Sequence, residues 1–222
     1  MKKRDLDLEL CLAVIEPAPE KVDKLIVEGA NVNAIGDKGY TRIAHCTPLW
    51  LAIQNAGQEM SESWTELYGA VKEVFPKIPE RNHATKRQEF KKIAKSLIEA
   101  GANLEAHCFG STPLWQAVRA KDSEMVKLLL SSGANPNAYT LSIVSNFAKK
   151  ERVKGPLGIM GYCDTVLHKA VEKRSSTIAE DLLTAGANPM TTDHEGKTPL
   201  NIAQEKSFDD MVQILNKVQL KK

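Results

Sequence analysis

Two histidine–cysteine pairs and one further cysteine are the residues of this sequence best suited to bind a metal ion. They are His45-Cys46, His107-Cys108 and Cys163. Thiolate and imidazole groups are the ligands that Zn²⁺ prefers in tetrahedral protein sites. However, no Cys-x-x-Cys spacing is present, and the two pairs stand at different distances from the Thr-Pro-Leu string that follows each of them. We therefore expect no metal site here, and unconnected turn residues instead.

The four cysteines also bear on the compartment. Cys11, Cys46, Cys108 and Cys163 are widely separated, which is typical of reduced, mostly structural thiols in a cytoplasm-like compartment. The first ten residues, MKKRDLDLEL, carry acidic side chains where a secretory signal needs its apolar core, so we expect no such signal. No stretch approaches 18 consecutive apolar residues, which argues against a membrane-spanning helix. We expect a cytoplasmic protein that does not contact membranes.

Catalytic motifs are missing from the sequence. The stretch GPLGIMG at 155–161 is rich in glycine but lacks the Lys-Ser/Thr ending of a phosphate-binding loop. No nucleophile elbow, paired-carboxylate pattern or zinc-protease pattern is present. We expect neither enzymatic activity nor a bound cofactor.

Two runs of basic residues could contact an acidic partner. The first comprises Lys77, Arg81, Lys86, Arg87, Lys91 and Lys92, and the second comprises Lys149, Lys150, Arg152 and Lys154. A solvated face is the simplest explanation of such runs. Nucleic-acid binding would need aromatic side chains between the basic ones, and these are nearly absent. The formal net charge of +2 also disfavours a polyanion partner, so an acidic protein is favoured over DNA or RNA.

The elements that position these residues come from an internal repeat. The 222 residues are 42% hydrophobic and 26% charged, as expected for a folded chain. The string Gly-Ala-Asn occurs four times, each time after an apolar run, and begins at Gly29, Gly101, Gly133 and Gly186. A second string, Thr-Pro-Leu or Thr-Val-Leu, interleaves with it and begins at Thr47, Thr112, Thr165 and Thr198. Two interleaved signatures with a period near 33 residues indicate a repeat architecture.

Each pair of strings marks a helix–turn–helix unit. Thr is a good N-cap and Pro is tolerated at the first helical position, because that N–H has no intrahelical partner. In one unit Leu114, Ala117 and Val118 share a helical face, and the stripe Val126, Leu129 and Leu130 follows on a second helix. Glycine then ends that helix. Because one helix pair cannot bury its apolar faces alone, successive units must stack. The sequence predicts an all-α solenoid.

These strings resemble the ankyrin repeat family, whose signature is T-P-L-H-x-A with a 33-residue period. The resemblance implies an ankyrin-repeat solenoid of stacked helix–turn–helix units with short β-hairpin fingers, in a single domain spanning 1–222. We expect five units, two of them enlarged: 5–34 as N-terminal cap, 35–106 with an insertion at 57–87, 107–138, 139–191 with a finger insertion at 140–163, and 192–222 as C-terminal cap.

The position after each Thr-Pro-Leu departs from the family pattern. Family members carry His there, and its ring joins a hydrogen-bond network at the base of the finger. This sequence has Trp50, Trp115, His168 and Asn201 at the four positions, so only His168 keeps that chemistry. The tryptophans either fill the core or present a ring edge to a binding surface.

The two insertions admit two interpretations each. In the first, residues 64–75 form a predicted amphipathic helix that either packs on its own array or faces a partner. In the second, glycines and a proline around Leu, Ile and Met predict an irregular loop with an apolar tip. This loop either contacts a partner or folds over the neighbouring finger.

The family resemblance implies a non-catalytic module that binds another protein through its concave face and finger tips. We expect it to act as an adaptor, scaffold or inhibitor, and to be a monomer when unbound. Aromatic residues and arginine dominate interface energetics. The candidate binding residues, placed by alignment to the Thr-Pro-Leu strings, are Tyr40, Arg42, Phe109, Ser111, Arg119, Tyr162, Asp164, Lys173, His194 and Lys197.

Three alternatives remain open on the sequence alone. The irregular insertions and stand-alone length suit a small bacterial ankyrin protein, either a host-delivered effector or an immunity-type inhibitor that uses the insertions as its binding surface. An enzyme, or a binder of a cofactor, small ligand or metal, built into the insertions is a second alternative. A self-associating structural array is the third, and concentration-dependent mass in solution would distinguish it.

Overall fold

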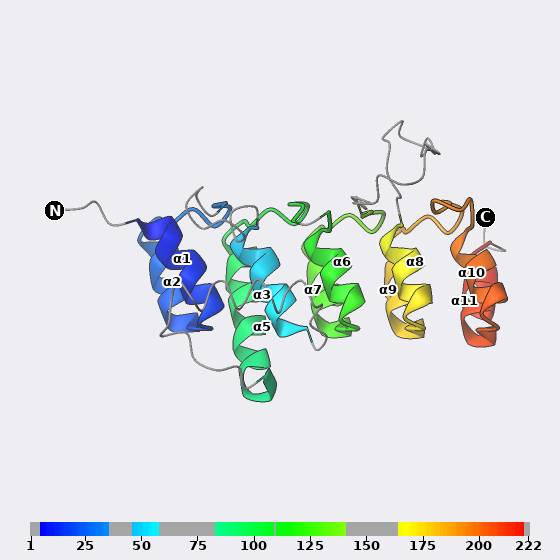
Figure 1. Ribbon diagram of the computed structural model, residues 1–222, viewed down its shortest axis with the longest axis horizontal. Helices are drawn as coiled ribbons and strands as arrows, with labels where there is room; N and C mark the ends of the chain where they lie inside the picture. Colours follow the sequence, from blue (N-terminus) through cyan, green and yellow to red (C-terminus); the bar gives the residue numbers. More distant parts are fainter. Residues whose placement is uncertain (1–4, 36–45, 58–82, 109, 141–163, 220–222) are drawn as a thin grey trace, which may run out of the picture. The chain divides into compact units, whose positions relative to one another are not determined.

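The computed structural model describes residues 5–35, 46–57, 83–108, 110–140 and 164–219 (Figure 1). The chain divides into two compact units, an N-terminal unit of residues 1–108 and a C-terminal unit of residues 109–222. The prediction of one continuous domain over 1–222 stays a prediction. None of the described helices combines the length and the apolar character needed to cross a bilayer.

The N-terminal unit contains two described helix pairs. The first pair is α1 (Leu6–Ile15) and α2 (Pro19–Val27), and the second is α3 (Pro48–Ala56) and α5 (His83–Glu99). The first helices α1 and α3 contact each other, and so do the second helices α2 and α5 (Figure 1). This like-with-like contact is the stacking expected of a repeat array.

The C-terminal unit repeats the same arrangement three times. Its pairs are α6 (Pro113–Arg119) with α7 (Ser123–Ser131), α8 (Val166–Glu172) with α9 (Ser176–Thr184), and α10 (Pro199–Glu205) with α11 (Asp209–Gln219). The first helices contact in the order α6, α8, α10, and the second helices contact in the order α7, α9, α11 (Figure 1). The mostly helical structure confirms the predicted all-α class.

The caps of the first helices follow the predicted pattern. The threonine before each of α3, α6, α8 and α10 accepts a hydrogen bond from the backbone N–H three residues on, from Trp50, Trp115, His168 and Asn201 respectively. At the end of α7, Gly133 has φ +96°, and the next N–H, of Ala134, reaches the carbonyl of Leu129 at 2.9 Å. Glycine adopts this left-handed conformation without a Cβ clash.

The predicted apolar stripes form the core of the helix pairs. Leu114, Ala117 and Val118 are completely buried on α6, and Val126 and Leu129 are completely buried on α7. Leu130, which the pattern also assigned to the buried stripe, is only partly buried.

One second helix is longer than its counterparts. α5 has 17 residues, whereas α2, α7 and α9 have 9 each. It begins at His83, so the end of the predicted 57–87 insertion is the start of α5 rather than a separate segment. Within the N-terminal unit α5 therefore reaches beyond the end of α3 (Figure 1). The predicted helix at 64–75 lies outside the described residues.

Asparagine side chains connect successive repeats between the helix pairs. Asn33 Oδ1 accepts the N–H of Asn103 at 2.6 Å, and Asn137 Oδ1 accepts the N–H of Asn188 at 2.7 Å. Each acceptor lies four residues after the glycine of its own repeat, Gly29 or Gly133. The same side-chain link thus recurs in both units, and it fixes the spacing of the loops that follow the second helices.

The fingers are described in part. In the fourth repeat the two arms of the finger form an antiparallel bridge between Tyr139 and Thr165. The N–H of Thr140 donates to the carbonyl of Asp164 at 3.0 Å, and the N–H of Val166 donates to that of Ala138 at 2.9 Å. The insertion predicted at 140–163 lies between these arms, and all of it after residue 140 is outside the described residues.

Candidate partner-binding face

Six of the ten candidate binding residues lie in the described part of the C-terminal unit. They come from the finger loops and from the first helices α6 and α8, a surface that we name the finger-and-first-helix face: Ser111, Arg119, Asp164, Lys173, His194 and Lys197. The other four candidates, Tyr40, Arg42, Phe109 and Tyr162, lie outside the described residues.

Arg119 is held in place by a buried glutamine. Its Nε donates to Oε1 of Gln116 at 2.9 Å, and Nε2 of Gln116 donates to Oγ of Ser111 at 2.7 Å. Gln116 and Ser111 are 6% and 4% exposed, whereas Arg119 is half-buried. Ser111 therefore supports the arginine through Gln116 rather than offering a surface of its own. No sequence pattern identified Gln116, whose role depends on its place one turn before Arg119.

Trp115 and Lys169 connect the first helices of the third and fourth repeats. The Lys169 ammonium lies 5.1 Å from the centre of the Trp115 ring, within the range of a cation–π contact, and also pairs with Glu172. Trp115 is partly exposed, and its buried indole Nε1 has no hydrogen-bond partner among the described residues, whereas Trp50 is only 2% exposed. Trp50 is thus a core residue, and Trp115 borders the face.

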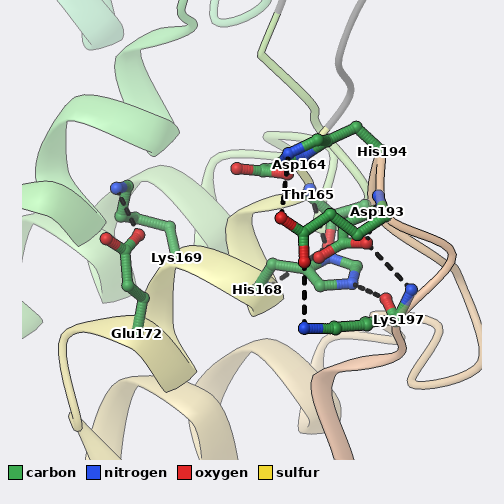
Figure 2. A network of polar contacts seen from close by, with 9 residues as sticks. Asp164, Thr165, His168, Lys169, Glu172, Asp193, His194 and Lys197 are labelled. Atoms are coloured by element: carbon green, nitrogen blue, oxygen red, sulfur yellow. Dashed lines mark hydrogen bonds and ion pairs between the residues drawn. The ribbon is translucent and has the colours of Figure 1, made fainter. Parts of the chain in front are cut away.

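His168 forms the hydrogen-bond network that the family resemblance implied (Figure 2). Its Nε2 lies 3.1 Å from the carbonyl oxygen of Lys197 in the next finger, and its Nδ1 lies 2.8 Å from Oγ1 of Thr165. Because a carbonyl can only accept, Nε2 carries the proton and Nδ1 accepts. Burial of this ring lowers its pKa below the ordinary value, although the Lys197 hydrogen bond opposes the shift. The neutral ring therefore ties the two fingers together.

Charged residues surround that buried histidine at the surface (Figure 2). Nδ1 of His194 lies 3.3 Å from Oδ1 of Asp164, with the two side chains 33% and 37% exposed. The Lys197 ammonium contacts Glu205 at 2.8 Å and Glu195 at 2.9 Å. The hydrogen bond to Glu205, and to a smaller extent the one to Glu195, raise the pKa of Lys197 above its usual range. The face thus presents both signs of charge at fixed positions.

Asp164, Asp193 and His194 bring three possible metal-ligand atoms within 4.8 Å of one another. The contacts of Asp193 indicate a structural role, because its Oδ1 accepts the backbone N–H groups of Glu195 and Lys197, each at 2.8 Å. Such an Asx turn shapes the tip of the finger. Asp193 is not one of the predicted site residues. Its place three residues before Gly196 is nevertheless a turn signal in the sequence.

The expectation of reduced thiols is wrong for two of the four cysteines. Cys46 and Cys108 form a disulfide, with their Cα atoms 5.0 Å apart across 62 residues of sequence. Cys11 is a free, buried thiol, and Cys163 lies outside the described residues. The two bonded cysteines stand at different distances from their Thr-Pro-Leu strings, so the spacing gives no sign of this bond. Stacked fingers bring these unlike positions together, which no local spacing can reveal.

Comparison with known proteins agrees with this architecture. The family model described as ankyrin repeats (3 copies) matches residues 82–140. Together with the capped helix pairs, this match identifies ankyrin repeats within the chain. Ankyrin repeats are protein–protein interaction modules and are generally non-catalytic, which agrees with the coarse prediction of function.

Similar curated proteins come from eukaryotes and a virus. The chain is 28% identical over 200 residues to the putative ankyrin repeat protein L92 of Acanthamoeba polyphaga mimivirus, covering 77% of this chain and 47% of L92. It is 32% identical over 123 residues to the probable E3 ubiquitin-protein ligase XBOS34 of rice, covering 54% and 20%. It is 30% identical over 125 residues to human NF-kappa-B inhibitor alpha, covering 54% and 37%.

The chain therefore spans less than half the length of these relatives. The predicted bacterial origin stays a prediction, since XBOS34, L92 and NF-kappa-B inhibitor alpha come from a plant, a virus and an animal.

Proposed function

We propose that this protein is a non-catalytic adaptor or inhibitor that binds a protein partner through the finger-and-first-helix face of its C-terminal unit. One observation carries the proposal: partly exposed charged side chains of three successive repeats are held at fixed positions by neighbours on the same face. Arg119 is held by Gln116, Asp164 by His194, and Lys197 by Glu195 and Glu205. Fixing such side chains beforehand lowers the entropy cost of binding.

The signs of these charges bear on the kind of partner. Acidic and basic groups alternate over a short distance, as in Asp164, His194, Glu195 and Lys197. A nucleic acid presents a single sign of charge and would be repelled by the carboxylates, whereas a protein surface can match both signs. We therefore propose a protein partner whose charges complement this alternation, and expect specificity and association rate to depend on it.

The test is capture from a native lysate with a triple variant and a matched control. The variant Arg119→Ala/Lys173→Ala/Lys197→Ala removes three positive charges from the face. The control Lys24→Ala/Lys95→Ala/Lys127→Ala removes three from second helices, where the lysine side chains are 61–71% exposed. A protein retained by wild type and control but lost by the variant supports the proposal. Equal retention by all three chains contradicts it.

The effector or immunity-type alternative predicts a different outcome of the same experiment. If the insertions form the binding surface, replacing residues 141–163 with a short Gly-Ser linker abolishes capture while the triple variant retains it. Self-association is distinguished by sedimentation equilibrium at several concentrations, because a partner-seeking monomer keeps a mass of 24.5 kDa.

A further inference from the structure

We propose that Cys46 and Cys108 are a reversible thiol–disulfide site within the N-terminal unit, which cross-links the start of α3 to the loop after α5 in response to the surrounding redox poise. Cys46 lies directly before Thr47, the N-cap of α3, and Cys108 lies in the finger of the next repeat. The Cα separation of 5.0 Å is within the range of protein disulfides. The bond closes a loop that contains α3 and α5, so its state acts on the N-terminal unit.

The array brings these two positions together whether or not a bond is formed. Cys46 stands one residue before the capping threonine of its repeat, and Cys108 stands seven residues after Gly101. In the C-terminal unit the corresponding residues are Asp164, before Thr165, and Asp193, seven residues after Gly186. Ligand atoms of Asp164 and Asp193 lie within 4.8 Å without a covalent bond. The reduced chain therefore keeps its two thiols face to face, and oxidation needs no change of fold.

Cys11 provides an internal contrast. It is 3% exposed on α1 and its thiol is free. Burial, with the nearby Asp7 and Asp5 charges, raises its pKa from 9.0 to about 11. The thiolate is the reactive form, so this raised pKa and the burial make the Cys11 thiol less reactive. The redox response is thus confined, among the described cysteines, to the one pair that the repeat stacking places together.

The reaction uses a small-molecule disulfide such as oxidised glutathione. One protein thiol loses its proton, and the thiolate attacks a sulfur of the small disulfide. This forms a mixed disulfide and releases one small thiolate, which takes up a proton. The second cysteine, also deprotonated, then attacks the protein sulfur of the mixed disulfide and releases the second small thiol. Two protein thiols are oxidised, and one small disulfide is reduced to two thiols.

Burial sets the rate of this exchange. Cys46 is completely buried and Cys108 is 2% exposed, so a small thiol or disulfide reaches them only when the base of the two fingers opens. Local opening of this kind costs less than global unfolding. We therefore expect exchange that is slow but complete under native conditions, and faster at low denaturant concentrations.

The experiment equilibrates the full chain in buffers of graded reduced-to-oxidised glutathione ratio, alkylates the free thiols after denaturation, and reads the mass. We expect a two-thiol step that maps to Cys46 and Cys108 and reverses when the ratio is reversed. Cys11 should be alkylated at every ratio. Hydrogen exchange should slow at 47–56 and 83–107 in the oxidised form, with residues 110–140 and 164–219 unchanged.

Three results would overturn the proposal. The first is four free thiols at every ratio. The second is a step that maps to a pair involving Cys163 or to a second chain, which Cys163→Ser would remove. The third is a Cys46–Cys108 bond that excess small thiol never reduces in the folded protein, because the bond would then be a permanent cross-link. The variants Cys46→Ser and Cys46→Ala should each leave Cys108 without an intramolecular partner, and either one suffices if the other fails to fold.

Discussion

The two units of this protein fill the same structural position with different chemistry. In the N-terminal unit a disulfide joins Cys46, the residue before the capping threonine, to Cys108, which stands seven residues after Gly101. In the C-terminal unit the same two positions are occupied by Asp164 and Asp193, and His194 lies next to them. Figure 2 shows this polar version, in which His194 contacts Asp164 above the buried ring of His168.

The difference teaches which part of a repeat is free to vary. The capped helices and the asparagine links are the same in both units, because they maintain the stacking. The finger position is not needed for stacking and can therefore carry a link of another kind. In the N-terminal unit that link is the Cys46–Cys108 disulfide, and in the C-terminal unit it is the contact of Asp164 with His194, next to the buried His168.

The strongest test of this comparison removes the covalent link. Cross-linking a loop of 62 residues stabilises a protein by roughly 4 kcal/mol through the entropy of the unfolded chain. We expect Cys46→Ala/Cys108→Ala to lower the free energy of unfolding of the N-terminal unit by about this amount in oxidising buffer, as measured by guanidinium denaturation.

The control for this prediction is the wild-type protein in excess reductant, whose curve should approach that of the double variant. Hydrogen exchange in the C-terminal unit should not change. Coincident curves for variant and wild type in oxidising buffer would mean that the disulfide contributes nothing to folding stability.

The equivalence of the two positions can be tested by moving the covalent link. We expect Asp164→Cys/Asp193→Cys to form a disulfide across the fourth and fifth fingers. The entropic gain for a loop of about 30 residues is roughly 3.6 kcal/mol, and loss of the two Asp193 turn hydrogen bonds removes about 1 kcal/mol each. A net gain of about 2 kcal/mol in the C-terminal unit should follow.

Alkylation and mass measurement check whether that bond forms, and each single cysteine variant serves as a control. If the double variant remains reduced while Cys46–Cys108 forms in the same molecule, the two finger positions are not structurally equivalent.

The pH response should be confined to the C-terminal unit. Burial lowers the pKa of folded His168, so the unfolded chain binds its proton first and stability falls as the pH drops below about 6.5, continuing until the folded pKa is reached. The slope is at most about 1.4 kcal/mol per pH unit. Hydrogen exchange between pH 7.5 and 5.5, corrected for intrinsic rates, should show greater loss of protection in α8 and α10 than in α3.

The matched variant for this prediction is His168→Asn, because Asn201 already serves as the same capping residue in the fifth repeat, with Oδ1 accepting the N–H of Thr198 at 2.9 Å. Asparagine keeps the cap but loses the reach to Lys197. We expect a cost of about 1 kcal/mol at pH 7.5 and a reduced acid response. An unchanged response would assign the pH dependence to another group.

The sequence predicted the elements well because their signals are local. Thr112, Pro113 and Gly133 mark the ends of helices through their own backbone chemistry, and the spacing of Leu114, Ala117 and Val118 gives the buried face directly. His168 was recognised because the family motif names its position. These features need no knowledge of the neighbouring repeat.

The features that the sequence did not predict depend on contacts between repeats or on where a helix begins in a segment without a motif. The Cys46–Cys108 bond joins unlike positions of two fingers, and the early start of α5 lies in an insertion without a motif. Gln116 positions Arg119 because its buried amide oxygen accepts the hydrogen bond of the arginine Nε, a contact that no motif announces.

The smallest expected effect concerns the ion pairs of the second helices. In the C-terminal unit Lys127 of α7 reaches Asp181 of α9 at 3.9 Å, whereas in the N-terminal unit Lys95 pairs with Glu99 of its own helix at 3.8 Å. Both lysine side chains are more than 60% exposed, so the pairs are weak and screened by salt. We expect Lys127→Ala and Lys95→Ala each to change the free energy of unfolding by less than about 0.5 kcal/mol.

Denaturant titration at low and high salt measures the effect of both substitutions. A cost above about 1 kcal/mol for Lys127→Ala alone, lost in high salt, would mean that the second helices of the C-terminal unit also carry a link between repeats, and that its fingers are not the principal place where the two units differ.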